Sequence, residues 1–170
     1  MQWTVKHGDI LDEPADVLIC SANPFLTLSG GVGGALLQRY GDPLRIELEE
    51  VLKSRSVNYV DRGSVIVTFP SDTPYKSIIH AVAVDGMYES SSQVITSVVR
   101  QSLHHAMDEG ATDVALTALG TGYGRLSPQA FAVGVKELSD EGFSPIERIT
   151  IVIKTAEEAE NIRQTLEYCQ

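Results

Sequence analysis

Short runs of almost entirely apolar residues, separated by longer amphipathic stretches, constrain the fold of this chain more than any other feature. Residues 16–21 read DVLICS and residues 148–153 read RITIVI. A strand with one face in water alternates apolar and polar residues, whereas a nearly continuous apolar run is typical of a strand buried on both faces of a parallel sheet. Four further strands are predicted at residues 3–6, 64–69, 77–84 and 113–118.

Helical patterns, with apolar residues three and four positions apart, fill the intervals between these strands. Helices are predicted at residues 32–40, 43–54, 90–109, 127–138 and 156–168. We expect Asp42 to cap the second helix, with Pro43 in its first position, and Gly110 to end the third. Strands that alternate with helices predict an α/β fold: a three-layer α/β/α sandwich around a central mixed, mostly parallel sheet, with residues 1–170 as one domain.

The apolar run at residues 16–21 leads into a glycine-rich loop, residues 22–36, that reads ANPFLTLSGGVGGAL. In parallel sheets ligands bind beyond the carboxyl ends of the strands, where such loops enter helices. Glycines let a ligand approach the backbone, and the helix that follows directs its free N–H groups into the loop. A turn without a ligand is the alternative, but glycines weaken the helix they begin, which favours a binding role. The candidate binding residues are Asn23, Gly30, Gly31, Val32 and Gly33.

A second glycine-rich loop, residues 119–128, reads LGTGYGRLSP and follows the apolar run at residues 113–118. Its spacing matches neither the dinucleotide-binding fingerprint nor the phosphate-binding loop of nucleotide hydrolases. Two such loops at the ends of parallel strands are nevertheless a stronger signal, because together they could hold both sides of a diphosphate. The candidate binding residues in this loop are Gly120, Thr121, Gly122, Tyr123 and Gly124.

The formal net charge of −10, from 23 acidic and 13 basic residues, restricts how such a ligand is held. Nucleic-acid backbone binding needs clustered lysines and arginines, so the acidic balance argues against direct binding of that kind. Backbone N–H groups and helix ends must therefore supply the contacts to any phosphate. No apolar run approaches the roughly 18 residues of a membrane span, and the opening residues lack the pattern of a signal peptide. We expect a cytoplasmic protein without a membrane partner.

The two cysteines and four histidines predict no metal site, and no cofactor is expected. Cys20 lies in an apolar run and is expected to be buried and free, whereas Cys169 is one residue from the printed end. An aspartate after the first strand, Asp9, can accept a hydrogen bond from an exocyclic amine such as that of adenine, although an exposed turn aspartate is the simpler interpretation.

These elements resemble, in their order and spacing, the macro domain family. That family has Gly-Asp-Ile near its start, a strand ending Asn-Ala-Ala-Asn, the motif Gly-Gly-Gly-Val-Asp-x-Ala-Ile, an Ile-His-x-Val strand and a Gly-x-Gly loop. The corresponding positions here are residues 8–10 (GDI), 21–23 (SAN), 30–36 (GGVGGAL), 79–82 (IHAV) and 120–124 (GTGYG). The resemblance covers nearly the whole chain and implies the α/β/α fold described above.

The resemblance also implies a cleft for ADP-ribose, free or attached to a macromolecule. Asp9 would accept the adenine amine, with the Ile10 backbone beside it. The first loop around Gly31 and the second loop from Gly120 to Tyr123 would hold the diphosphate and the distal ribose. Asn23 would face that ribose, and Tyr123 would cover it. His80 is expected to be a core histidine rather than part of the site.

Three departures from the family pattern concern catalysis. One hydrolytic branch activates water with the aspartate after Gly-Gly-Gly-Val, and the aligned residue here is Gly33. The first asparagine of Asn-Ala-Ala-Asn is replaced by Ser21. A second branch uses a lysine and an aspartate in the Gly-x-Gly loop, where this chain has Gly124, and Lys76 has no evident place in the cleft. We therefore predict binding without efficient hydrolysis by either route.

Two alternatives remain open at this level. The first is a hydrolase of ADP-ribosyl esters or O-acetyl-ADP-ribose, with Asn23 positioning the sugar and a loop aspartate (Asp61, Asp72 or Asp85) as base. The second is a catalytically idle assembly domain.

A further departure concerns the adenine. The family often has an aromatic residue after the last strand that stacks on adenine, whereas this chain has Lys154 and Thr155 there. Affinity for the ligand would therefore be modest unless another side chain, such as Tyr168, takes that role.

Overall fold

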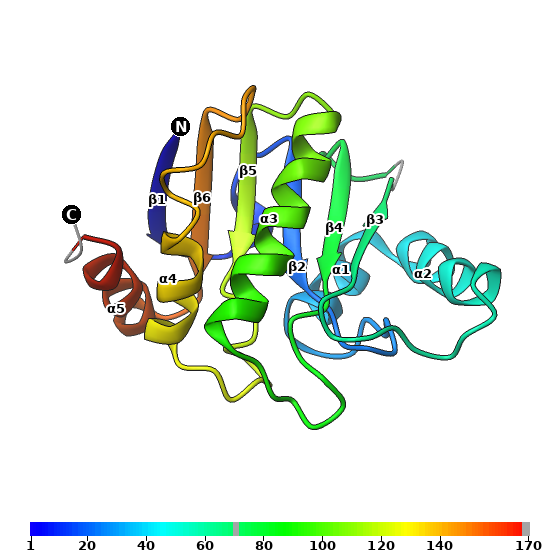
Figure 1. Cartoon of the computed structure of the whole chain (residues 1–170). Helices are drawn as coiled ribbons and strands as arrows, with labels where there is room; N and C mark the ends of the chain where they lie inside the picture. The colour runs from blue at the N-terminus through cyan, green and yellow to red at the C-terminus, as the bar shows by residue number, and fades with distance from the viewer. Residues whose placement is uncertain (70–71, 168–170) are drawn as a thin grey trace.

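A computed structural model describes residues 1–69 and 72–167 of the chain. Its strands form one six-stranded sheet in the order β1-β6-β5-β2-β4-β3 (Figure 1). Their bounds are β1 Gln2–His7, β2 Val17–Ser21, β3 Val65–Thr68, β4 Ser77–Ala81, β5 Asp113–Thr117 and β6 Arg148–Ile153. Every neighbouring pair is parallel except β3 and β4, which are antiparallel. The predicted mixed, mostly parallel sheet is therefore confirmed.

Helices cover both faces of this sheet (Figure 1). The α-helices are α1 Gly31–Tyr40, α2 Asp42–Ser54, α3 Ser92–Asp108, α4 Pro128–Lys136 and α5 Ala156–Glu167, and a short 3-10 helix, η1, spans Ile10–Asp12. Helices α3, α4 and α5 pack on one face, and α1 and α2 pack on the other. The three-layer α/β/α sandwich is confirmed. None of the helices in the described ranges is long and apolar enough to cross a membrane.

The apolar runs are continuous because each buried strand contributes to two cores. Side chains of a strand alternate between its faces, so Val17 and Ile19 of β2 pack under α3 and α4, while Leu18 and Cys20 pack under α1 and α2. All four side chains are fully buried. Cys20 is a free, buried cysteine, as predicted.

Several predicted boundaries are wrong by a few residues. The fourth strand ends at Ala81 rather than at residue 84, because its partner β2 ends opposite it at Ser21. Asp42 is the first helical residue of α2 and not its cap, since Gly41 turns the chain with a φ of 79°. Helix α3 begins at Ser92, and the hydroxyl of Ser91 caps it. Tyr168 and Cys169 lie outside the described residues.

The parallel strands place five loops at one edge of the sheet. The carboxyl ends of β1, β2, β4, β5 and β6 all point to the lower edge in Figure 1. The first glycine-rich loop leaves β2 and the second leaves β5, and these two strands are neighbours in the sheet. The topology therefore brings together two loops that are about 90 residues apart in the sequence.

Candidate functional site

A cavity of about 340 Å³ lies at this edge, between the two glycine-rich loops. Its lining includes every binding residue predicted from the sequence except Asp9. The predicted residues that line it are Ile10, Asn23, Gly30, Gly31, Val32, Gly33, Gly120, Thr121, Gly122, Tyr123 and Gly124. A cavity of this size falls in the range of small-molecule sites.

The first loop directs the amino end of α1 into the cavity. Gly30 and Gly31 adopt φ values of 72° and 53°, in the left-handed region that favours glycine. No side chain in the described part of the chain caps this helix end. The first N–H groups of a helix lack intrahelical acceptors, and here they belong to Gly31, Val32 and Gly33, which line the cavity. Free N–H groups and the helix dipole both favour a negative charge at this place, so the arrangement is chemically suited to an anion.

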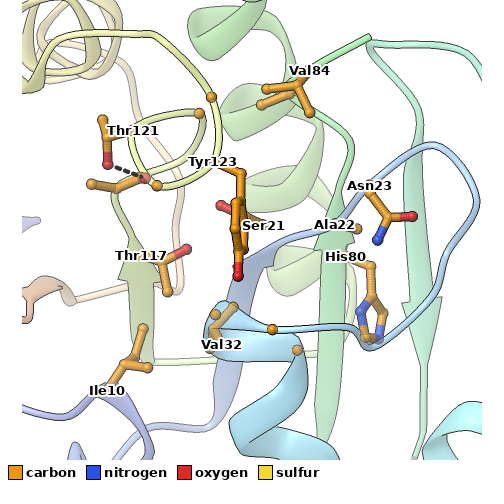
Figure 2. Close-up of a pocket in the computed structure, with 18 of the residues that line it drawn as sticks. Ile10, Ser21, Ala22, Asn23, Val32, His80, Val84, Thr117, Thr121 and Tyr123 are labelled. Atoms are coloured by element: carbon orange, nitrogen blue, oxygen red, sulfur yellow. Dashed lines mark hydrogen bonds between the residues drawn. The ribbon is translucent and has the colours of Figure 1, made fainter. Parts of the chain in front are cut away.

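The second loop folds back tightly on itself. Gly120 has a φ of 77°, and its carbonyl oxygen accepts a hydrogen bond from the N–H of Leu126 at 3.3 Å. The Thr121 hydroxyl donates to the carbonyl oxygen of Ala118 at 2.9 Å (Figure 2). A Cβ atom on Gly124 would lie 2.0 Å from the carbonyl oxygen of Gly120, so the observed turn admits only glycine there. The sequence placed a glycine-rich binding loop here, and the structure shows that the loop is closely packed.

The two loops face each other across the cavity, and Tyr123 spans the gap between them. Its ring extends from the second loop toward the amino end of α1 (Figure 2). A Cβ atom on Gly30 would come within 2.5 Å of the Tyr123 hydroxyl oxygen, so the contact depends on a glycine. Because the Tyr123 side chain is 71% exposed, it covers the cavity rather than filling it.

Asn23 lines the cavity, but its side chain is fully engaged within its own loop. Its Nδ2 donates to the carbonyl oxygen and to the hydroxyl of Thr27, at 2.8 and 2.9 Å. Its Oδ1 accepts from the N–H groups of Phe25 and Thr27, at 3.0 and 3.3 Å. An asparagine amide has two donor hydrogens and two acceptor lone pairs, so its capacity is used. In this structure Asn23 organises the loop that holds the glycines.

Asp9 lies beside the cavity rather than in its wall. Its Oδ1 accepts a hydrogen bond from the N–H of Leu11 at 2.9 Å and so caps η1. Its Oδ2 is 3.9 Å from the guanidinium of Arg39. Ile10, the next residue, is buried and lines the cavity. The prediction that Asp9 contacts an exocyclic amine stays a prediction.

The end of the cavity near β6 combines aliphatic side chains with one basic and one acidic residue, Lys154 and Glu158. Its described lining residues are Gly8, Ile10, Val152, Ile153, Lys154 and Glu158, with no aromatic residue among them. The Glu158 carboxylate accepts a hydrogen bond from the Thr155 hydroxyl at 2.8 Å. A flat apolar group fits between such aliphatic side chains without aromatic stacking.

His80 is a core histidine whose ring reaches the wall of the cavity. Its Nε2 is 2.9 Å from the Thr68 hydroxyl, which itself donates to the carbonyl oxygen of Ile78. Nε2 therefore donates to Thr68, and Nδ1, 3.7 Å from Sγ of Cys20, accepts from the thiol. Burial lowers the pKa of His80 to about 4 and raises the pKa of Cys20 to about 12. Both side chains are neutral, and neither has a free atom for acid–base chemistry.

Protonation of His80 is expected to destabilise the protein in mildly acidic solution. Its pKa is about 4 in the folded state and 6.5 ordinarily, so the unfolded chain binds the proton more readily. The stabilisation is complete above pH 6.5 and is lost progressively as the pH falls to 4, by roughly 3 kcal/mol. The free energy of unfolding can be measured with urea at pH 7 and at pH 4. Between these two pH values it should fall by about this amount more in the parent protein than in His80→Gln. Equal losses in the two proteins would contradict this account.

Thr117 and Val84 are among the lining residues that had no place in the predicted site. Thr117 ends β5, and its hydroxyl is buried without a partner among the described residues. Val84, which the sequence placed within a strand, lies in the loop after β4 and lines the cavity. The polar residue that interrupts the apolar run at residues 113–118 was the available signal for Thr117.

Carboxylates are scarce around this cavity. Among the described lining residues Glu158 alone carries one, and it lies at the β6 end. Asp61, Asp72 and Asp85 are not in the lining. Hydrogen bonds from the N–H groups of Glu89 and Met87, with Arg62 nearby, lower the pKa of Asp85, which makes it a weaker base. Lys76 lies 3.3 Å from Asp16, at the opposite edge of the sheet.

Comparisons with known proteins agree with this arrangement. Residues 19–133 match the family model described as the Macro domain. The chain is 30% identical to a macro domain-containing protein of Streptomyces griseus, over 86% of this chain and 84% of that protein. It is 28% identical to an O-acetyl-ADP-ribose deacetylase of Klebsiella pneumoniae, over 98% and 97%. A macrodomain of Oceanobacillus iheyensis with ADP is similar in fold, with a TM-score of 0.87 and 19% identity, over 96% and 89%.

Proposed function

Because the chain belongs to the macro domain family, we propose that it binds ADP-ribose, free or attached to a macromolecule, between its two glycine-rich loops. The observation that carries this proposal is the pair of loops facing each other across one cavity, with the amino end of α1 directed into it. Backbone N–H groups then neutralise the diphosphate, which fits a chain with a net charge of −10.

The two ends of the cavity suit the two ends of this ligand. The aliphatic β6 end, with Ile10 and Ile153, takes the adenine, and Asp9 beside it accepts the exocyclic amine. The β2 and β4 end, with Ser21, Asn23 and Val84, takes the distal ribose. The diphosphate lies between them, near the ring of Tyr123 and the Thr117 hydroxyl, which is buried and has no partner among the described residues.

The site binds without efficient hydrolysis by the two routes that the family resemblance suggests. Both positions aligned with a catalytic aspartate are glycines that the fold encloses. A Cβ atom on Gly33 would lie 3.2 Å from Cα of Leu28, and one on Gly124 would overlap the carbonyl oxygen of Gly120. The single lining carboxylate of the described residues, Glu158, lies at the adenine end, far from the bond that would break.

Hydrolysis of O-acetyl-ADP-ribose is the second candidate, because relatives at 28–31% identity are named as deacetylases of that compound. In this candidate the ester reacts with a water bound to the diphosphate, and Asn23 positions the sugar. The four hydrogen bonds within the loop oppose that role, because Asn23 would have to release Thr27 or Phe25 to contact the ligand.

Turnover assays separate these candidates. We expect calorimetry to show saturable binding of ADP-ribose, and we expect no release of ADP-ribose from mono-ADP-ribosylated protein at ordinary enzyme rates, about 1 s⁻¹ or more. Multiple turnovers at such a rate would reject the binding function in favour of a hydrolase. Release of acetate from O-acetyl-ADP-ribose alone would select the second candidate. No heat at millimolar ADP-ribose would favour an assembly role without a ligand.

Replacing Asp9 tests the orientation of the ligand. Asp9→Ala is expected to weaken ADP-ribose binding about tenfold or more through loss of one hydrogen bond to a charged acceptor, with ribose-5-phosphate affected little. Asp9→Asn is the matched control for the cap of η1, because its amide oxygen can still accept from the N–H of Leu11. If calorimetry shows that Asp9→Ala loses the same affinity for ADP-ribose and for ribose-5-phosphate, the adenine does not lie beside Asp9.

A further inference from the structure

Five large apolar side chains are exposed on the loops that form the cavity or adjoin it. We call them the mouth rim: Phe25, Tyr59, Met87, Tyr88 and Tyr123, with exposed fractions of 56%, 56%, 74%, 47% and 71%. They belong to the loop after β2, the segment before β3, the loop after β4 and the second glycine-rich loop. A cluster of exposed apolar side chains on an otherwise acidic protein marks an interaction surface.

Hydrogen bonds and an ion pair join these loops into one surface. Phe25 and Tyr59 pack edge to face, 6.4 Å apart, and the N–H of Val60 donates to the carbonyl oxygen of Pro24 at 2.8 Å. The guanidinium of Arg62 then reaches the Asp85 carboxylate at 3.2 Å. The mouth rim is therefore continuous from the first loop to the loop after β4.

The other half of the rim is fixed by the loop after β4. The Asp85 carboxylate accepts hydrogen bonds from the N–H groups of Met87 and Glu89, at 2.9 and 3.0 Å. Tyr88 has a φ of 62°, and its carbonyl oxygen accepts from the N–H of Arg125. Its ring lies 6.5 Å from that of Tyr123. A surface held in place before binding loses little conformational entropy when a partner docks.

A small molecule inside the cavity does not account for this surface. Phe25, Tyr59 and Met87 do not line the cavity, so a free ligand bound there leaves them in water. Tyr88 and Tyr123 do line it, and they connect the rim to the β2 and β4 end. That end takes the distal ribose in the proposed function, and the distal ribose is where an ADP-ribosyl group is attached to a macromolecule.

We propose that the mouth rim docks the polypeptide segment that carries an ADP-ribosyl group, an inference that rests on the proposed binding function. A polypeptide supplies apolar side chains for the exposed aromatic residues, whereas a nucleic acid brings phosphates toward a chain of net charge −10. Arg62, which lies between the two halves of the rim, is paired with Asp85, so this pair adds no net charge that would attract a phosphate backbone.

The test compares free ADP-ribose with a short synthetic peptide that carries ADP-ribose through a non-hydrolysable link. The peptide is expected to bind about tenfold more tightly, because it covers apolar area that the free ligand leaves exposed. The double variant Phe25→Ser, Met87→Ser should bind the two ligands equally, with the affinity for free ADP-ribose unchanged within about twofold. Neither residue lines the cavity.

Phe69→Ser is the matched control, since Phe69 is an aromatic residue with an exposed fraction of 61%. It follows Thr68, which pairs with Ile78 near the start of β4, so it lies at the opposite edge of the sheet. This variant should keep the preference for the peptide. Equal binding of peptide and free ADP-ribose by the parent, or a preference for an ADP-ribosylated oligonucleotide over the peptide, overturns the docking inference alone. If the parent protein binds none of the three ligands (free ADP-ribose, the ADP-ribosylated peptide and the ADP-ribosylated oligonucleotide), the proposed function itself is overturned.

Discussion

Replacing Gly31 by glutamate is expected to weaken ADP-ribose binding at least about 100-fold. Gly31 begins α1 and lines the cavity, and a Cβ atom there would point into space whose nearest atom is the Tyr123 ring, 3.9 Å away. The longer side chain of glutamate would carry its carboxylate to the helix N–H groups and occupy the place of the diphosphate. The carboxylate and the diphosphate cannot occupy that site together. Because the carboxylate is covalently attached to the protein, it excludes the diphosphate.

The control is Gly31→Ala, which shares the backbone strain of the glutamate variant, because Gly31 has a φ of 53°. Strain of this kind costs about 1 kcal/mol. We therefore expect Gly31→Ala to bind ADP-ribose within about tenfold of the parent. The additional loss of affinity in Gly31→Glu then measures the effect of the charged glutamate side chain. Binding of ADP-ribose by Gly31→Glu with the parental affinity in calorimetry would show that the ligand lies elsewhere.

A single methyl group on Gly124 is expected to disrupt the second glycine-rich loop. The added Cβ atom would lie 2.0 Å from the carbonyl oxygen of Gly120 and 2.7 Å from its carbonyl carbon, so the backbone must move. Strain of about 2–3 kcal/mol would lower the melting temperature by about 5–10 °C. The N–H groups of the loop would lose their alignment on the diphosphate, and ADP-ribose affinity should fall about tenfold or more.

Gly122→Ala is the control within the same loop. Among the described residues no atom lies within 4 Å of a Cβ placed on Gly122, and its φ is outside the left-handed region. Its melting temperature should match that of the parent. If scanning calorimetry gives Gly124→Ala and Gly122→Ala the same melting temperature, the tight turn seen here is wrong, and a catalytic aspartate at residue 124 would no longer be sterically barred.

Much of the fold follows from patterns that act locally. The run DVLICS predicts a strand buried on both faces because its alternate side chains must both avoid water, and Val17 and Leu18 do pack in opposite cores. The ends of the strands, in contrast, are set by the neighbouring strands with which they pair and not by the local sequence. Residues 82–84 are as apolar as the strand before them, yet β4 ends at Ala81, where pairing with β2 ends.

For the candidate site too, one part could be predicted from the sequence and another part could not. Glycines after buried strands identify both loops, and the parallel sheet brings the loops together. Their conformations could not be predicted, because glycine permits many backbone angles and only the folded loop selects one. The overlap between Gly124 and Gly120, the four hydrogen bonds of Asn23 and the position of Tyr123 over Gly30 all depend on that selection.

A titration of ¹⁵N-labelled protein with ADP-ribose, followed through the backbone amide signals, reports on both glycine-rich loops at once. In the proposed function, N–H groups of two loops hold one diphosphate. The signals of Gly31, Val32 and Gly33 and those of Gly120, Thr121 and Gly122 should shift together and saturate with a single affinity. Shifts confined to one loop, or none in either loop at saturating ligand, would contradict this proposal.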